Sequence, residues 1–386
     1  MKTANKLNDF KAYGGPAMHQ KLTLMKAEGR DVINLGLGDP DVVPADHQLK
    51  ALVDAVSDPN NHHYPSAYTA KPFNLAIADW YKRGHDVEID PETEVIYCLG
   101  GADGLFQIYY CLLDYGDLVL IPDPGYPSYE AGAKIAGGTV EFYPLLSENK
   151  FLPNLEAIPS DVAKKAKMIW INYPNNPTGA TVTADFYRKL IEWAKEFDVW
   201  VVSDNPYIDV YFGRHKPPSF LSLPGAKEVG IEIVSMSKSF NSCGWRVGML
   251  LGNKDIVSGV KKVKSQVDRG IFYPLQVATV AALTGPVGWM KERNEIFAER
   301  RDVVVKAWRK MGLEMMNPMA TFYCWGRLPE GYESREFCQQ LLEQQNVWMI
   351  PGSSYGKNGE GYVRISNAQP VERIVEAMER IEKFIG

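Results

Sequence analysis

A lysine with small hydroxyl-bearing neighbours is the first chemically distinctive feature of the sequence. Lys238 ends the segment Ser235-Met-Ser-Lys238, which directly follows a predicted strand, and Arg246 follows in Gly244-Trp-Arg246-Val-Gly248. A lysine amine that is partly removed from water can be neutral and nucleophilic near pH 7, which suits Schiff-base formation. The planar fork of donors on Arg246 suits a phosphate group. The alternative is an ordinary surface lysine, which the Arg and Gly residues behind it disfavour.

Two polar clusters have the residue types that bind a flat nitrogen heterocycle. Asp204 follows the apolar run Val199–Val202, where a carboxylate is costly unless it is paired. A protonated pyridine nitrogen is a suitable partner, and the pair turns the ring into an electron sink. Asn176, in a Pro/Gly loop, and Tyr207 could each contact a ring oxygen. The alternatives are a turn or capping aspartate, a plain turn and a packed core tyrosine.

Three further clusters add to this pattern. The Gly-rich loop Leu99–Gly104 leads from a predicted strand into a helix, where backbone N–H groups bind phosphate, or it is a simple turn. Tyr126, in a Pro-rich turn, could stack on a flat cofactor or serve only in packing. Arg364 lies in an otherwise apolar predicted strand and wants a carboxylate, either on a ligand or on an internal acid.

The elements that must position these residues are short buried strands. The runs rich in Val, Ile, Trp and Tyr are Glu94–Leu99, Asp117–Ile121, Lys167–Asn172, Val199–Ser203, Ile231–Ser235 and Arg246–Leu251. Between two of them, Thr183–Phe197 has apolar residues at helical spacing. Strands that alternate with helices predict a largely parallel α/β sheet covered on both faces. Ligands of such sheets bind at the carboxyl ends of the strands, where the polar clusters fall.

The chain changes in texture after Leu283. A long charged helix, Gly288–Met311, is followed by the predicted strands Ala320–Leu328 and Gly361–Asn367 with the helix Ser334–Gln345 between them, and a last helix begins near Pro370. We therefore predict a large cofactor-binding domain over residues 45–284. A small α+β domain is predicted from residues 1–44 and 285–386.

The composition limits the class of protein. The chain has 386 residues, 45% of them hydrophobic, and a net charge of -5 without a basic patch, so neither nucleic acid nor an anionic membrane is an expected partner. Its five cysteines are scattered and lack metal-binding spacing, which indicates reduced thiols, no metal and a cytoplasmic protein. No apolar stretch approaches the roughly 18–20 residues of a membrane span, and the polar N-terminus is unlike a signal peptide.

In this order and spacing the clusters resemble the fold-type I, class I/II pyridoxal-phosphate-dependent aminotransferases. The resemblance runs from Gly36-Leu-Gly38-Asp-Pro-Asp41 to Val363-Arg364-Ile-Ser366. It implies a mainly parallel mixed sheet with helices on both faces, a small α+β domain, and amino transfer from an L-amino acid to a 2-oxo acid, with 2-oxoglutarate expected, by a ping-pong mechanism. Lys238 would form the internal aldimine and shuttle the proton between the substrate Cα and the cofactor.

The resemblance also implies roles for individual residues. Asp204 would pair with the pyridine nitrogen, and Arg364, with Gly38 and Asn176, would bind the substrate α-carboxylate. Tyr64 matches a tyrosine that reaches the phosphate of the neighbouring subunit, which implies a homodimer. The full set of cofactor-binding residues implied is Lys238, Gly101, Ala102, Asp103, Tyr126, Asn176, Asp204, Tyr207, Ser235, Ser237, Arg246 and Tyr64, and the catalytic residues are Lys238, Asp204 and Tyr207.

The substrate is less closely defined. The stretch Val267–Phe272 is similar to the L,L-diaminopimelate aminotransferase branch, which also contains enzymes for aspartate, alanine and aromatic amino acids. Arg269 could receive a distal carboxylate or be a surface residue. Asp103, Thr69 and Asn74 depart from the residues usual in relatives, and an acid beside a phosphate is unfavourable unless its side chain turns away. A carbon–sulfur β-lyase of the same fold stays open, as does a non-catalytic regulator, which the retained Lys238 disfavours.

Overall fold

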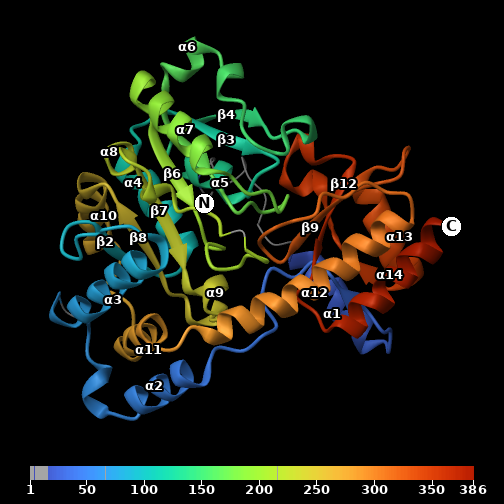
Figure 1. Ribbon diagram of the computed structural model, residues 1–386, viewed down its shortest axis with the longest axis horizontal. Helices are drawn as coiled ribbons and strands as arrows, with labels where there is room; N and C mark the ends of the chain where they lie inside the picture. Colours follow the sequence, from blue (N-terminus) through green and yellow to red (C-terminus); the bar gives the residue numbers. More distant parts are fainter. Residues whose placement is uncertain (1–3, 5–15, 66, 215) are drawn as a thin grey trace.

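The larger part of the molecule is built on a seven-stranded sheet (Figure 1). A computed structural model describes residue 4 and residues 16–65, 67–214 and 216–386. The strand order is β2-β8-β7-β6-β5-β3-β4, and β8 pairs antiparallel with both of its neighbours while the other pairs are parallel. The strands are β2 (Val95–Cys98), β3 (Leu118–Asp123), β4 (Thr139–Pro144), β5 (Ala166–Ile171), β6 (Trp200–Asp204), β7 (Gly230–Ser235) and β8 (Gly248–Gly252). The predicted α/β fold with a mainly parallel mixed sheet is confirmed.

Helices cover both faces of this sheet. One face packs on a hydrophobic core that includes α4 (Gly101–Leu112), α5 (Ser128–Ile135) and α10 (Lys254–Val267). The other packs on a core formed with α3 (Ala67–His85), α7 (Ala184–Phe197) and α11 (Tyr273–Thr284). The other described α-helices of this part are α2 (Asp46–Val56), α6 (Ser160–Ala163), α8 (Ala226–Val229) and α9 (Met236–Ser239).

Helix α7 shows how local sequence sets an element. The Thr183 hydroxyl accepts a hydrogen bond from the Phe186 N–H at 3.4 Å and caps the first turn, and Asp198 ends the helix in the left-handed conformation. Leu190 and Trp193 are buried on the face that meets the sheet. The predicted helix Thr183–Phe197 therefore differs from α7 only in counting its cap.

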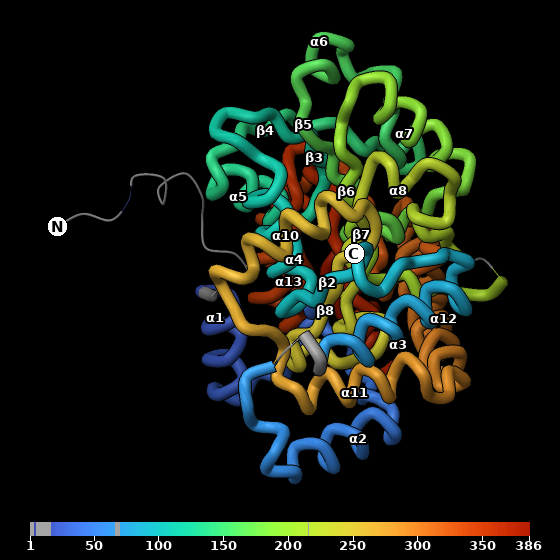
Figure 2. The backbone as a smooth tube through the Cα atoms, turned by 90° about the vertical axis from the view of Figure 1, so that its left-hand side faces the viewer, coloured from blue at the N-terminus to red at the C-terminus, as the bar shows by residue number. Residues whose placement is uncertain are grey.

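The smaller part has its own core. Figure 2 views the molecule from the side of the large sheet, so the C-terminal segments of the smaller part, in red, lie behind that sheet. Strands β11 (Ile350–Pro351), β12 (Tyr362–Ser366) and β9 (Tyr323–Arg327) form an antiparallel sheet, and β1 (Ile33–Asn34) pairs in parallel with β10 (Val347–Trp348). The helices around them are α1 (Pro16–Ala27), α12 (Gly288–Lys310), α13 (Ser334–Gln345) and α14 (Val371–Ile385). The N-terminal segment and the C-terminal third thus share one core, and the exact domain boundaries at residues 44/45 and 284/285 stay a prediction.

Helix α12 spans the two parts (Figure 1). Near its start the buried Arg293 donates to the carbonyls of Ser239, at the end of α9, and of Asp209, while its later residues Val304 and Trp308 pack in the smaller core. Among the described helices none is both long and apolar enough to cross a membrane.

Candidate active site

The predicted polar residues meet along one edge of the large sheet. Parallel strands present their carboxyl ends at the same edge. There β6 ends at Asp204, and the loop after β5 carries Asn176. Strand β7 ends at Ser235 and leads into α9 with Lys238. Strand β8 runs the opposite way, so its beginning lies at the same edge and brings Arg246 beside them.

A phosphate-sized cradle forms where β2 turns into α4. Gly100 has φ 87°, and a Cβ there would lie 2.3 Å from the Arg246 Nη2 atom, so the guanidinium rests directly on the loop. A Cβ on Gly101 would lie 3.8 Å from the Ser235 Cβ. The first N–H groups of a helix have no partners within it, so those of Gly101 and Ala102 are suited to an anion. The cradle therefore joins backbone donors, a hydroxyl and a guanidinium.

Asp103 does not bring its carboxylate into this cradle. Its Oδ2 atom accepts from the Leu99 N–H at 2.8 Å and from Lys264 Nζ at 2.8 Å, and its Oδ1 atom accepts from Gln107 at 3.0 Å. Although burial acts to raise the pKa of Asp103, these hydrogen bonds outweigh it and the pKa is lowered. The side chain turns away and stays charged, so only the backbone N–H of Asp103 remains a candidate for phosphate binding.

Asp204 is a partly buried carboxylate with a tyrosine partner. The Tyr129 hydroxyl donates to Asp204 Oδ2 at 2.6 Å, and the Asn172 amide donates to the Asp204 carbonyl at 2.7 Å. Burial raises the pKa of Asp204 to about 6, while the Tyr129 hydrogen bond lowers it and the charge of Glu232 raises it. A carboxylate whose charged form is disfavoured in this way is stabilised by a nearby cation.

Lys238 points into the gap between the large sheet and the N-terminal segment. Its Nζ atom donates to the Gly38 carbonyl at 2.5 Å, lies 3.3 Å from Cys243 Sγ and lies 3.5 Å from Asp39 Oδ1. Burial acts to lower the pKa of Lys238, but the charges of Tyr323, Cys243 and Asp39 act the other way and the pKa is raised. The expected burial is found, whereas these partners favour the charged amine rather than the expected neutral one.

Arg364 is held on β12 in the smaller part and faces the same gap. It donates to Asn176 Oδ1 and to the Gly36 carbonyl, each at 2.9 Å. Its guanidinium carbon lies 4.0 Å from the centre of the Tyr323 ring. The Tyr323 hydroxyl in turn lies 3.2 Å from the Tyr207 hydroxyl and 3.5 Å from the Gly38 carbonyl, the acceptor of Lys238. Arg364 is therefore linked to Lys238 through the Tyr323 side chain and the Gly38 carbonyl.

The other predicted residues lie at different distances from this centre. Tyr126 follows β3 and packs edge-on against Tyr129, with ring centres 5.6 Å apart. Ser237 is buried, and its N–H donates to Ser235 Oγ at 3.1 Å. Tyr64 is 86% exposed, and Arg269 is exposed beside a cavity of about 240 Å³ that also involves Pro65 and Tyr97.

Two of the departures noted in the sequence lie on α3. Asn74 donates to the Pro91 carbonyl at 3.0 Å, before the start of β2, so its amide is engaged away from the carboxyl ends of the strands. The side chain of Thr69 lies outside the described residues.

Sequence reasoning missed three residues at the centre. Tyr129 binds Asp204, Tyr323 joins Arg364 to Tyr207, and Cys243 contacts Lys238. Tyr129 lies three residues after Tyr126, and Cys243 directly precedes the Gly244–Gly248 motif, so their positions were a usable signal. Tyr323 lies in a predicted strand whose pairing with the Arg364 strand was unknown from sequence.

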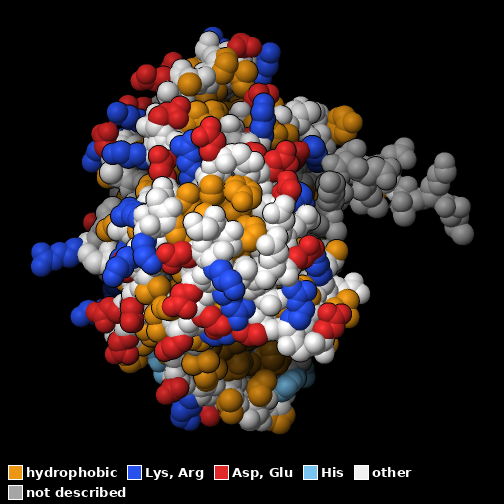
Figure 3. Space-filling view, turned by 90° about the vertical axis from the view of Figure 1, so that its right-hand side faces the viewer, with side chains coloured by type: hydrophobic (Ala, Val, Ile, Leu, Met, Phe, Trp, Pro, Cys, Tyr) orange, Lys and Arg blue, Asp and Glu red, His pale blue; other side chains and the backbone are white. Residues whose placement is uncertain are grey.

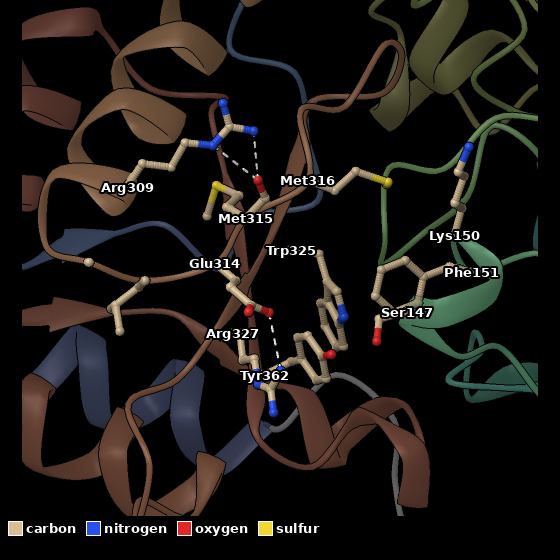
Figure 4. A pocket seen from close by; sticks show the side chains of 12 residues that line it. Ser147, Lys150, Phe151, Arg309, Glu314, Met315, Met316, Trp325, Arg327 and Tyr362 are labelled. Carbon is tan, nitrogen blue, oxygen red and sulfur yellow. Dashed lines mark hydrogen bonds and ion pairs between the residues drawn. The ribbon is translucent and has the colours of Figure 1, made fainter.

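A larger hollow lies elsewhere, between the two parts of the molecule. It measures about 560 Å³ and is lined by Trp325 and Tyr362 on one side and Phe151 and Lys150 on the other (Figure 4). The predicted site residues are not among those that line it. Volume therefore does not locate the chemistry, which lies where the charged and hydroxyl side chains converge.

These features fit a pyridoxal phosphate group. The Arg246 guanidinium can lie against the Gly100 loop, where an anion would be held, only because no Cβ is present, and the partly buried Asp204 is suited to a cationic ring nitrogen. Lys238 offers an amine between these two ends. An α/β sheet with this edge defines the class of pyridoxal-phosphate enzymes that carry the cofactor on a strand-end lysine.

Comparison with known proteins supports the same class. The sequence model of the family described as aminotransferase class I and II matches residues 30–381. An LL-diaminopimelate aminotransferase of Aquifex aeolicus is 48% identical over 92% of each chain, and one of Moorella thermoacetica is 42% identical over 100% of this chain and 99% of its own. The structure of apo-BacF from Bacillus subtilis is similar with a TM-score of 0.96 and 38% identity, each chain being covered completely.

The chain therefore belongs to the class I and II aminotransferases. It is an enzyme, a pyridoxal-phosphate-dependent aminotransferase with the fold type I architecture.

Proposed function

We propose that this enzyme transfers the amino group of LL-diaminopimelate to 2-oxoglutarate. The observation that carries the proposal is the fixed position of Arg364, which hydrogen bonds to Asn176 and to the Gly36 carbonyl hold in place. Its guanidinium stacks on Tyr323, whose hydroxyl contacts the same Gly38 carbonyl that accepts from Lys238. A guanidinium held in this way matches the carboxylate that amino acids and 2-oxo acids share. The names of the relatives at 48% and 42% identity support LL-diaminopimelate as the donor.

The chain's own residues divide the work. Bound pyridoxal phosphate supplies an electron sink for the charge that develops at the substrate Cα. Asp204 holds a proton on the ring nitrogen, while Lys238 Nζ, in its neutral form, takes the proton from the substrate Cα and later returns it. Arg364, with Gly38 and Asn176, orients the substrate so that its Cα–H bond faces Lys238.

The remaining residues anchor the cofactor. The phosphate is held by the Gly101, Ala102 and Asp103 N–H groups together with side chains of the α9 segment. Tyr126 stacks on the ring, and Asn176 and Tyr207 contact its hydroxyl. The side chains proposed for the phosphate are Ser235, Ser237 and Arg246, with Tyr64 from a second subunit.

The proposed assembly is a homodimer in which Tyr64 serves the neighbouring site. Tyr64 is largely exposed, and Leu49, Val53 and Val56 on α2 are exposed as well. Hydrophobic side chains gather at the lower end of the molecule in Figure 3, the end that α2 forms in Figure 1. An exposed apolar surface of this kind is typical of an interface. Arg269, which lines the same cavity as Pro65, is proposed to receive the distal carboxylate of a dicarboxylic substrate.

The five cysteines are free thiols, which supports a cytoplasmic location.

A donor–acceptor screen tests the proposed reaction. The purified enzyme with pyridoxal phosphate is mixed with 2-oxoglutarate and with LL-diaminopimelate, aspartate, alanine or phenylalanine in turn, and glutamate is measured. We expect LL-diaminopimelate to give the highest kcat/KM. A faster reaction with another donor would overturn the substrate, whereas ammonia and pyruvate released from cystathionine without glutamate would indicate a β-lyase.

Lys238→Ala provides the control for the chemistry. It should abolish glutamate formation and change the visible absorbance of the bound cofactor, because the amine that contacts the cofactor is gone. Unchanged absorbance in this variant would remove Lys238 from its role.

A further inference from the structure

A fully buried carboxylate lies behind the site and takes no part in the contacts described so far. Glu232 is in the middle of β7 and is 0% exposed. Its two oxygens accept five hydrogen bonds, from Tyr81 (2.8 Å), Ser219 (2.6 Å), Ser203 (2.9 Å), Asn205 (3.2 Å) and the Phe220 N–H (3.1 Å). Burying a charge is costly unless such partners compensate. A neutral side chain would avoid this cost, so the retained carboxylate calls for a role.

Two of the five donors are the immediate neighbours of Asp204. Ser203 pairs directly with Glu232 in the β6–β7 register, and Asn205 follows Asp204, its own N–H donating to the Ile233 carbonyl at 2.8 Å. Successive side chains of a strand point to opposite faces. Ser203 and Asn205 therefore reach Glu232 on one face, while Asp204 points to the other, where Tyr129 binds it.

We propose that Glu232 is a positioning residue that clamps the backbone on both sides of Asp204 and so aims its carboxylate at the cofactor ring nitrogen. The inference rests on the role proposed for Asp204. The Tyr81 hydroxyl and the Phe220 N–H tie Glu232 to α3 and to the loop before β7, so the clamp is anchored in the core. Glu232 itself touches neither cofactor nor substrate.

Two serine variants form a matched pair that tests the clamp. Ser203 and Ser219 are both buried, and each donates one hydroxyl hydrogen bond to Glu232, but only Ser203 adjoins Asp204. Ser203→Ala should raise the Kd for pyridoxal phosphate roughly tenfold or more and alter the visible circular dichroism of the bound cofactor, as the loss of a partner behind a ligand residue does. Ser219→Ala should lower only the thermal stability. Equal effects of the two variants on the Kd and spectrum, or no effect of either, would overturn the proposal.

Substitutions of Glu232 separate hydrogen bonding from charge. In Glu232→Gln the Tyr81 and Ser219 hydroxyls can reverse to accept from the new amide, while its oxygen still faces Asn205 and the Phe220 N–H. We therefore expect Glu232→Gln to keep a Kd for pyridoxal phosphate and a visible circular dichroism spectrum near those of the wild type. Glu232→Ala should raise that Kd and alter that spectrum. If Glu232→Gln is as defective as Glu232→Ala, the proposal that Glu232 positions Asp204 through hydrogen bonds is wrong.

Asp204→Ala distinguishes the two levels of proposal. If it leaves the Kd and the spectrum unchanged, the role proposed for Asp204 is wrong. If it is defective while Ser203→Ala behaves as Ser219→Ala does, Asp204 keeps its role and the inference about Glu232 alone fails.

Discussion

Arg364 gathers its contacts from three separate stretches of the chain. It donates to Asn176 after β5 and to Gly36 before the large sheet begins, and it stacks on Tyr323 from β9. A guanidinium already held on several sides loses little further freedom when it binds a carboxylate. The contacts therefore fix the orientation of the Arg364 guanidinium before a substrate binds.

Replacing Arg364 should therefore affect all substrates alike. Arg364→Ala is expected to lower kcat/KM by roughly 100-fold or more for each amino acid, mainly through KM, because two hydrogen bonds of about 1.5–3 kcal/mol each are lost. Steady-state kinetics with several donors measures this. Arg327→Ala, which removes an exposed arginine paired with Glu314, is the control and should change nothing. A defect confined to one donor would mean that Arg364 reads a side chain instead.

The turn from β2 into α4 depends on a missing side chain. Gly100 begins the helix with a positive φ, and the Arg246 guanidinium occupies the space that a Cβ would need. The element therefore combines a conformation that favours glycine with a close approach by Arg246, which precedes β8.

Gly100→Ala should displace Arg246 and raise the Kd for pyridoxal phosphate by roughly tenfold or more, which corresponds to about 1.4 kcal/mol. Gly116→Ala is a matched control, because Gly116 has φ 92° but nothing lies within 4 Å of its missing Cβ. Both variants carry a backbone cost of about 1–3 kcal/mol. Cofactor titration and thermal unfolding measure the two effects, and a Kd equally unchanged in both variants would contradict the cradle.

Most elements could be predicted because their residues bury one face or both. Strands β5 and β7 match the predicted runs to within a residue, and α13 matches its predicted range. Strand β4 was missed because it lies at the sheet edge, where Thr139, Glu141 and Phe142 are exposed and the apolar signal is weak.

The site was predictable to the extent that its residues follow strands in sequence. The partners Tyr323 and Glu232 were not, because their importance comes from pairings between distant strands. The opposite orientation of Asp103 from its phosphate-facing neighbours likewise depends on Lys264, far along the chain.

The whole molecule presents Tyr64 to the outside rather than to its own site. At 86% exposure this side chain contributes nothing to the packing of its own subunit, which is expected if a second subunit covers it. The α2 surface nearby is apolar as well, so both features belong to one proposed interface.

Mixed dimers test whether Tyr64 acts across that interface. Tyr64→Phe should weaken pyridoxal phosphate binding, whereas Tyr115→Phe, at 94% exposure, should not. A dimer of one Tyr64→Phe and one Lys238→Ala subunit should regain one site of normal affinity and activity, because that site takes Lys238 from the first subunit and Tyr64 from the second. If the remaining site of the mixed dimer binds pyridoxal phosphate as weakly as the Tyr64→Phe homodimer does, Tyr64 acts within its own subunit.

The reversed direction of β8 makes residues 235–248 one short, unbroken link between the Lys238 amine and the Arg246 guanidinium, which is proposed to bind phosphate. Elsewhere in the sheet, neighbouring site residues are separated by a crossover helix, whose length can drift without moving either end. Here the length of the loop of residues 239–245 determines the distance between Lys238 and Arg246. Adding a single residue to it would shift Arg246 relative to Lys238 without changing the paired residues of β7 and β8, so the length of this loop sets the separation of the two groups.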